Sequence, residues 1–303
     1  MKVGLSIHRL QHFGFDPEAY TAIARAAEQA GFDSLWMGDH LAFPEALPPH
    51  PYAASGIGHQ RPDTPWLDPW VTLTYLAAAT TRIKLATDVY VLPLRSPFVT
   101  AKAVATLDLL SRGRVIFGVG VGWCEPEFAA VGEAFHNRGR RCDELIEAIR
   151  ILWTEETAEF HGDYYDFEPV KFEPKPLQSP HPPIHYGGIS PAALKRAAER
   201  CDGWIEAPQS FDDLKACVER IRELRKAAGR DHLPFEITKG LAWPFDHGDL
   251  ARYAEIGVTR ITTSPWNETD GSGRQTSLAA ALEAIGRAGA ELRLASLDES
   301  RAD

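Results

Sequence analysis

Short apolar runs alternate with longer segments of helical periodicity eight times along this chain. This alternation is typical of repeated β-strand and α-helix units, and runs that are apolar on both faces are typical of buried parallel strands. The strand candidates are Val3–Ile7, Ser34–Met37, Ile83–Val89, Val115–Val119, Ile184–Tyr186, Gly203–Ile205, Phe235–Thr238 and Arg260–Thr263. Eight units predict an α/β fold, a (β/α)8 TIM barrel forming one domain over residues 1–303, in preference to a doubly wound open sheet.

Helix start and stop signals separate the strand candidates. A capping side chain precedes a proline at Asp16-Pro17, Asp68-Pro69, Ser96-Pro97 and Ser190-Pro191. These residue pairs are favoured where helices begin. Glycines suited to helix ends stand at Gly31, Gly113, Gly229, Gly257 and Gly289. We therefore expect helices to cover the strands.

Two stretches interrupt the alternation and predict insertions after strands two and four. Residues Ala42–Leu67 are rich in Pro, Gly, His and aromatic residues, and long loops in compact domains are commonly functional. Residues Thr157–Pro183 contain an aromatic-rich segment followed by a proline-rich run. The second pattern predicts a β-hairpin followed by a tether.

Composition excludes several function classes. The formal net charge of −10, with no basic stripe, argues against a nucleic-acid partner. No charged leader and no apolar run of about 20 residues stands in the sequence, which predicts a cytoplasmic protein without a membrane segment. The four cysteines form no C-x-x-C pair and the histidines show no ligand spacing, so we expect buried reduced thiols and no metal.

The catalytic candidates follow from the barrel itself, whose active sites lie at the C-terminal ends of the strands. Asp39 and His40 leave the second predicted strand together. Histidine exchanges protons near neutral pH, which suits general acid or base work. A structural histidine bonded to a loop is the alternative interpretation of His40.

Two glycine-rich turns are candidates for binding a phosphorylated ligand. Gly187, Gly188 and Ser190 join a strand to a helix start, where backbone N–H groups and the helix dipole favour a phosphate. A tight turn with a capping serine is the alternative. Gly118, Gly120 and Gly122 resemble a dinucleotide fingerprint only in part, because Trp123 replaces the third glycine. Such glycines instead allow a flat ligand to lie against the backbone.

Several segments resemble the luciferase-like flavin monooxygenase superfamily, in particular its subgroup that uses the deazaflavin coenzyme F420. The resemblance covers nearly the whole chain. It is carried by Asp39-His40, Thr87 to Pro97, Ala101 to Arg114, Gly118 to Trp123, Arg138 to Arg141, and Pro183 to Gly188.

The resemblance implies an oxidoreductase that transfers a hydride between F420 and a small organic substrate. The coenzyme ring would lie in the barrel mouth, with its phosphate at Gly187, Gly188 and Ser190. A non-proline cis peptide at Asp88 and Val89 would back the ring. His40 would face the reactive edge of the ring, near Asp39. The resemblance further implies a homodimer, with a separate F420 or flavin reductase supplying reduced coenzyme.

Other readings of the same barrel stay open. One is a two-component monooxygenase that uses FMN, oxygen and a partner reductase, and another is a non-catalytic flavin-binding barrel. Related sugar-phosphate dehydrogenases carry other residues where Pro44 and Trp123 stand here, so that specific activity is not expected. The substrate pocket is predicted to contain His8, Phe43, Trp66, Trp123 and Trp266.

Overall fold

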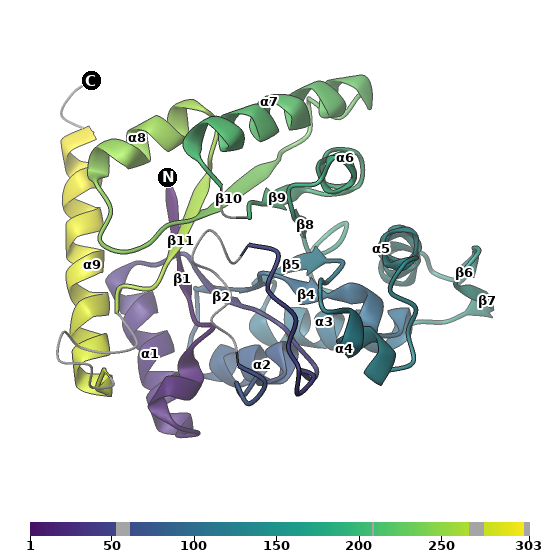
Figure 1. The fold of residues 1–303 in the computed structure, drawn as a ribbon, viewed down its shortest axis with the longest axis horizontal. Helices are drawn as coiled ribbons and strands as arrows, with labels where there is room; N and C mark the ends of the chain where they lie inside the picture. Colours follow the sequence, from purple (N-terminus) through teal and green to yellow (C-terminus); the bar gives the residue numbers. More distant parts are fainter. Residues whose placement is uncertain (53–60, 208, 267–275, 300–303) are drawn as a thin grey trace.

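The computed structural model describes residues 1–52, 61–207, 209–266 and 276–299 (Figure 1). Within these residues eight parallel strands close into a barrel, because β3 pairs with β5 and β11 pairs with β1. In barrel order the strands are β1 (Lys2–Ser6), β2 (Ser34–Met37), β3 (Lys84–Thr87), β5 (Val115–Gly120), β8 (Ile184–Gly187), β9 (Gly203–Ile205), β10 (Glu236–Gly240) and β11 (Arg260–Thr263). The predicted (β/α)8 barrel is confirmed.

Helices surround the barrel, as Figure 1 shows. They are α1 (Pro17–Ala30), α2 (Pro69–Ala79), α3 (Pro97–Ser111), α4 (Glu125–Ala130), α5 (Arg138–Thr154), α6 (Pro191–Arg200), α7 (Phe211–Ala227), α8 (His247–Glu255) and α9 (Leu278–Glu299), with short 3-10 helices η1 (Leu10–Phe13) and η3 (Leu92–Leu94). All four predicted cap-proline pairs begin helices. The side chains of Asp16, Asp68 and Ser190 accept hydrogen bonds from the first-turn N–H groups of their helices. No helix in the described part of the chain is long and apolar enough to cross a bilayer.

One predicted helix end is wrong. Gly31 does end α1 in the left-handed conformation, with φ of 94°. Gly289, in contrast, lies inside α9, where a Cβ atom would overlap the carbonyl oxygen of Ala30. This glycine therefore serves the close approach of α9 to α1 rather than a turn.

The two insertions leave the barrel where the sequence predicts. After α5, β6 (Ala158–His161) and β7 (Asp166–Val170) form an antiparallel hairpin at the edge of the molecule (Figure 1). The hairpin is thus confirmed. The first insertion follows β2, and its residues 53–60 lie outside the described residues.

Large polar and aromatic side chains fill the closed end of the barrel. Trp36 and Arg260 are both fully buried, and the Arg260 guanidinium lies 5.4 Å from the Trp36 ring. Arg260 bonds to Glu236 at 2.6 Å and to Asp33 at 3.1 Å. Gly4 leaves the space for this packing, because a Cβ there would lie 2.5 Å from Nε1 of Trp36. Side chains therefore fill this end of the barrel, and a ligand would bind at the opposite end.

Candidate active site

The third barrel strand is broken by a bulge at the barrel mouth. A non-proline cis peptide joins Asp88 to Val89, and the strand resumes as β4 (Tyr90–Val91), paired with β5. The cis bond that the family resemblance implied is therefore present at the expected position. The backbone N–H of Asp88 donates to the carbonyl of Met37 at 3.0 Å, which ties the bulge to β2.

The glycines of the mouth, which the sequence predicts to contact a flat ligand, make room for this bulge. A Cβ on Gly120 or on Gly187 would lie 2.5 Å from a methyl group of Val89. A Cβ on Gly118 would overlap the backbone of Thr87. The Val89 side chain consequently occupies the centre of the barrel and forms an apolar floor beneath the mouth.

Gly122 has the same kind of role at the rim. It adopts a left-handed φ of 74°, and a Cβ there would lie 2.6 Å from Val91 and 3.0 Å from Phe128. Its neighbours are thus side chains of β4 and α4. All three glycines of the 118–122 run are explained by contacts within the protein.

His40 is held by a buried carboxylate that the sequence reasoning missed. Nδ1 of His40 lies 3.0 Å from Oε2 of Glu127, whose side chain is 1% exposed. The other oxygen of Glu127 accepts the backbone N–H of Leu41 at 2.6 Å. Because an ionised carboxylate only accepts hydrogen bonds, this contact places the proton on Nδ1 and turns Nε2 into the nitrogen that can act on a ligand.

Aromatic rings surround His40. Ring centroids of Phe43, Trp66 and Trp123 lie 4.4, 4.9 and 5.9 Å from that of His40. His50 packs on Trp123 at 4.7 Å, and its burial together with the nearby His40 lowers the pKa of His50. The structure therefore brings three predicted pocket residues together with the candidate acid–base residue. The indole nitrogen of Trp66 is buried without a hydrogen-bond partner among the described residues.

Asp39, the second predicted catalytic residue, has its carboxylate engaged in contacts within the protein. Its carboxylate is fully buried and forms a two-point ion pair with Arg95, at 2.6 and 2.8 Å. It also accepts the backbone N–H of Val91 at 2.9 Å. Its three hydrogen bonds run to β4 and to the residue after η3, so Asp39 ties the end of β2 to both.

His8 pairs with the bulge instead of lining the pocket as a free side chain. Its Nε2 lies 2.5 Å from Oδ1 of Asp88. Burial alone would lower the pKa of His8, but the charge of Asp88 and this hydrogen bond outweigh burial, so the pKa of His8 is raised. The mouth therefore contains two histidine–carboxylate pairs, His8–Asp88 and His40–Glu127.

The predicted phosphate turn lies where β8 meets α6. Gly188 has a positive φ of 121°, and the Ser190 side chain accepts the N–H of Ala193 at 3.2 Å, as a capping residue does. Arg138 is half-buried at the start of α5, and its Nε donates to the carbonyl of Gly122 at 3.2 Å. The turn thus brings the start of α6 to the barrel mouth, although the N–H of Gly188 already donates to the carbonyl of Ile205 at 3.3 Å.

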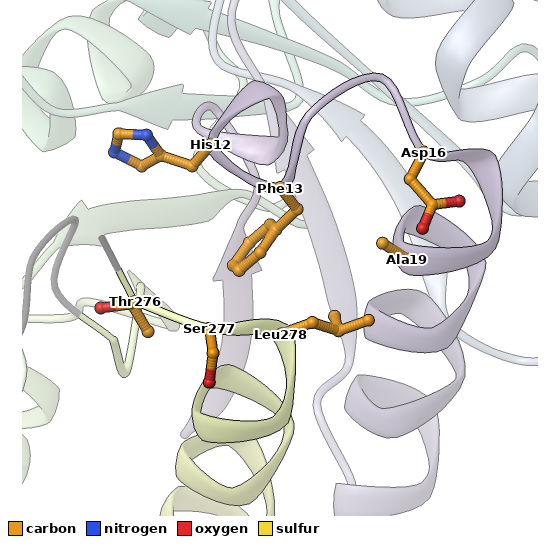
Figure 2. Close-up of a pocket in the computed structure, with 7 residues that line it drawn as sticks. All are labelled: His12, Phe13, Asp16, Ala19, Thr276, Ser277 and Leu278. Carbon is orange, nitrogen blue, oxygen red and sulfur yellow. The ribbon is translucent and has the colours of Figure 1, made fainter. Parts of the chain in front are cut away.

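Trp266 lies apart from the His40 cluster. It is 8% exposed and its ring packs edge-on against Phe13 of η1, with centroids 6.0 Å apart. Phe13 also borders a pocket of about 280 Å³, in which it points toward the start of α9 (Figure 2). The pocket is lined by His12, Phe13, Asp16, Ala19, Thr276, Ser277 and Leu278. Trp266 therefore belongs to the packing of η1 in this structure.

Comparison with known proteins gives the family. Residues 3–294 match the model of the luciferase-like monooxygenase family, and the chain belongs to that family. Two of the relatives described next are named as an FMNH2-dependent monooxygenase and an F420-dependent dehydrogenase.

The relatives include uncharacterized proteins and two enzymes whose names give different coenzymes. An uncharacterized protein of Mycobacterium bovis is 36% identical over 80% of this chain and 83% of its own. The FMNH2-dependent dimethylsulfone monooxygenase of Pseudomonas putida is 39% identical over 76% of this chain and 59% of its own. The F420-dependent glucose-6-phosphate dehydrogenase of Amycolatopsis mediterranei is 35% identical over 77% of this chain and 71% of its own.

A solved structure shares the architecture. The monooxygenase RslO1 from Streptomyces bottropensis superposes with a TM-score of 0.73 at 20% identity, covering 94% of this chain and 96% of that one. At this identity the match describes the fold alone.

Proposed function

We propose that this protein transfers a hydride between coenzyme F420 and a small organic substrate. The observation that carries the proposal is the His40–Glu127 pair at the barrel mouth, where Nδ1 of His40 is bonded to a carboxylate that is 1% exposed. A histidine fixed in this way has one nitrogen committed to orientation and one available for proton transfer. A protein that only stored a chromophore would have no use for such a pair.

The fit of the coenzyme is supported by the floor and by the phosphate turn. Val89 presents an apolar side chain at the centre of the barrel, against which a flat ring can rest. The start of α6, which follows Gly187 and Gly188, supplies a helix dipole suited to a phosphate. Arg138 adds a guanidinium, the group that pairs best with phosphate oxygens.

The work of the protein is to position the reactants and to manage one proton. The coenzyme, when bound, supplies or accepts two electrons as a hydride. Nε2 of His40 gives a proton to the substrate oxygen as a carbonyl is reduced, or takes it from a hydroxyl in the opposite direction. Phe43, Trp66 and Trp123 exclude water around that nitrogen, and Glu127 stabilises the imidazolium. Placement at near-attack distance supplies the remaining rate enhancement.

An FMN-dependent monooxygenase is the second candidate, because the relative with 39% identity is described as FMNH2-dependent. The same floor and phosphate turn would hold FMN. In that case reduced flavin would come from a partner reductase, and the substrate would gain an oxygen atom from O2. For F420 the corresponding partner is a deazaflavin reductase.

Anaerobic titration of the purified protein with F420 and, separately, with FMN tests binding, and assays in aerated buffer then test oxygen uptake. Binding of F420, followed by substrate-dependent change of its absorbance without oxygen consumption, is the expected result. Preference for FMN with oxygen uptake would move the assignment to the monooxygenase. Failure of both coenzymes to bind would overturn both candidates.

A further inference from the structure

The bulge that forms the floor of the mouth carries a carboxylate. Asp88 lies on the N-terminal side of the cis peptide, and its side chain is 13% exposed. The Met37 carbonyl holds its backbone from one side, and the neighbouring Val89 is enclosed by Gly120 and Gly187 from the other. The backbone of Asp88 is therefore held at the floor, and its carboxylate is held there by the contact with His8.

A fixed negative charge at this position is unfavourable for the proposed ligand. A deazaflavin or flavin ring gains electron density on reduction, and like charges a few ångströms apart repel in a partly buried site. A floor that binds the reduced ring needs this charge to be compensated.

His8 provides the compensation. It leaves β1 beside Asp88, with Nε2 at 2.5 Å from the carboxylate oxygen, and it is the histidine of the mouth that contacts the bulge. The charged groups acting on His8 are Asp88, which favours the imidazolium, and Arg9, which opposes it. The hydrogen bond and the charge of Asp88 prevail over burial and over Arg9.

We propose that His8 and Asp88 act as one neutral imidazolium–carboxylate pair that makes the floor of the mouth compatible with an anionic, reduced ring. This inference rests on the proposed function. It assigns His8 a role in coenzyme binding, whereas His40 acts on the substrate. When His8 loses its proton, the carboxylate is left uncompensated and the ring is repelled.

Trp66 lies near both histidines of the mouth. Cζ3 of Trp66 lies 3.1 Å from the position of a Cβ on Gly38, and Cε1 of His8 lies 3.6 Å from the same position. The Trp66 ring also contacts His40, at 4.9 Å between centroids. Trp66 therefore packs near both imidazoles, and each imidazole contacts a different carboxylate.

The pair is tested first in the protein without coenzyme, by the titration of histidine ring signals in carbon–proton correlation spectra. His8→Gln identifies the His8 signal. We expect His8 to titrate above the ordinary histidine range, and Asp88→Asn to bring it back down. A signal that titrates at or below the ordinary value in the wild type would overturn the pair, whatever coenzyme the protein uses.

Binding of reduced F420, measured by calorimetry between pH 6 and pH 9, tests the role. Affinity is expected to fall as pH rises through the pKa of His8. His8→Gln should weaken binding by about tenfold at pH 6, the equivalent of one pKa unit. The double variant His8→Gln/Asp88→Asn should restore the affinity and remove its dependence on pH, because both partners are then neutral.

The hairpin supplies a matched control. His161 and Asp166 form a similar pair, with 2.6 Å between Nδ1 and the carboxylate, on the exposed β6–β7 hairpin (Figure 1). His161→Gln should leave coenzyme affinity and its pH dependence unchanged. If reduced F420 binds the wild type and His8→Gln equally well, the role of the pair is overturned while the proposed function stands. If neither F420 nor FMN binds the wild type, both are overturned.

Discussion

The carboxylate of Asp39 and the guanidinium of Arg95 form a two-point ion pair across the outer side of the barrel mouth, with N–O distances of 2.6 and 2.8 Å. The pair ties the end of β2 to the segment after η3. His40 follows Asp39 directly, so the orientation of the candidate acid–base residue depends on this buried ion pair. Arg95 also lies over the ring of Tyr90 at 4.3 Å.

Removal of one partner of this pair should destabilise the fold. Asp39→Asn leaves Arg95, whose side chain is 11% exposed, without its counter-charge. Breaking a buried pair in this way costs about 3–5 kcal/mol. Urea denaturation measures the loss. Asp63→Asn, which breaks the exposed pair with Arg61, is the control and should leave the midpoint unchanged. Equal midpoints for Asp39→Asn and the wild type would show that the pair contributes little.

Substitutions at His40 and Glu127 should separate chemistry from orientation. His40→Asn removes the proton-transfer nitrogen and is expected to lower kcat by about 100-fold or more, with little change in coenzyme affinity. Glu127→Gln keeps a hydrogen-bond acceptor but loses the charge that stabilises the imidazolium, so a smaller fall in kcat at similar KM is expected. Steady-state kinetics measures both. Unchanged turnover in His40→Asn would remove His40 from the mechanism.

Two glycines of α9 should respond in opposite directions to the same change. Gly286→Ala adds a Cβ with nothing within 4 Å, and alanine in a helix interior is favoured by about 0.5–1 kcal/mol over glycine. Gly289→Ala forces a Cβ into the backbone of Ala30 and should cost about 1–3 kcal/mol. Thermal unfolding of the two variants compares them directly. A stabilised Gly289→Ala variant would contradict the tight contact of α9 with α1.

The barrel strands could be predicted because their signals are local. Ser34–Met37, Gly203–Ile205 and Arg260–Thr263 are strands with the bounds that the apolar runs indicated. The prediction that Gly289 ends a helix was wrong because it also used a local signal. Glycine is found both at helix ends and where two helices pack closely, and only the neighbouring helix distinguishes the two cases. Local patterns identify elements and leave their contacts open.

The candidate site was predictable as a set of positions but not as a set of pairs. The barrel rule placed His8, His40 and Asp88 at the mouth. The contact of Glu127 with His40 was not predictable, because the two residues are 87 positions apart and meet only when α4 packs near the end of β2. The ion pair of Asp39 with Arg95 was not predictable, because adjacency to His40 in sequence does not say which way each side chain points.

Acid should destabilise the barrel through His185. Its burial, together with the nearby Arg260, lowers the pKa of His185 to about 4 in the folded state. The unfolded chain binds the proton at about 6.5, so stability is present above that pH and is lost as pH falls toward 4. The difference corresponds to about 3 kcal/mol. Urea denaturation at pH 7 and at pH 4.5 should show this loss in the wild type.

His185→Gln isolates the contribution, because glutamine carries no titrating group. The variant should lose less stability than the wild type between the two pH values. His161→Gln is the contrasting control, since Asp166 raises the pKa of His161 and its contribution has the opposite sign. An identical pH dependence in His185→Gln and the wild type would show that other groups control the acid response.

The outer faces of α2 and α3 predict self-association. Helices on the barrel surface are ordinarily polar on the side away from the core. Here four large apolar or aromatic side chains stand on that side, namely Val71 (71% exposed) and Tyr75 (46%) on α2 and Val99 (64%) and Leu110 (65%) on α3. The two helices pack against each other, so these residues belong to one surface of the molecule. An apolar surface of this kind marks an interface, and a second copy of this chain is the partner we expect.

Light scattering coupled to size-exclusion chromatography measures the association. The wild type is expected to elute as a dimer. The double variant Val71→Glu/Val99→Glu is expected to elute as a monomer, because a symmetric interface would bury both new carboxylates of each copy without counter-charges. Leu233→Glu, which changes a 39% exposed leucine before β10, should remain dimeric. A monomeric wild type would contradict the prediction, and a dimeric double variant would place the interface on another face of the barrel.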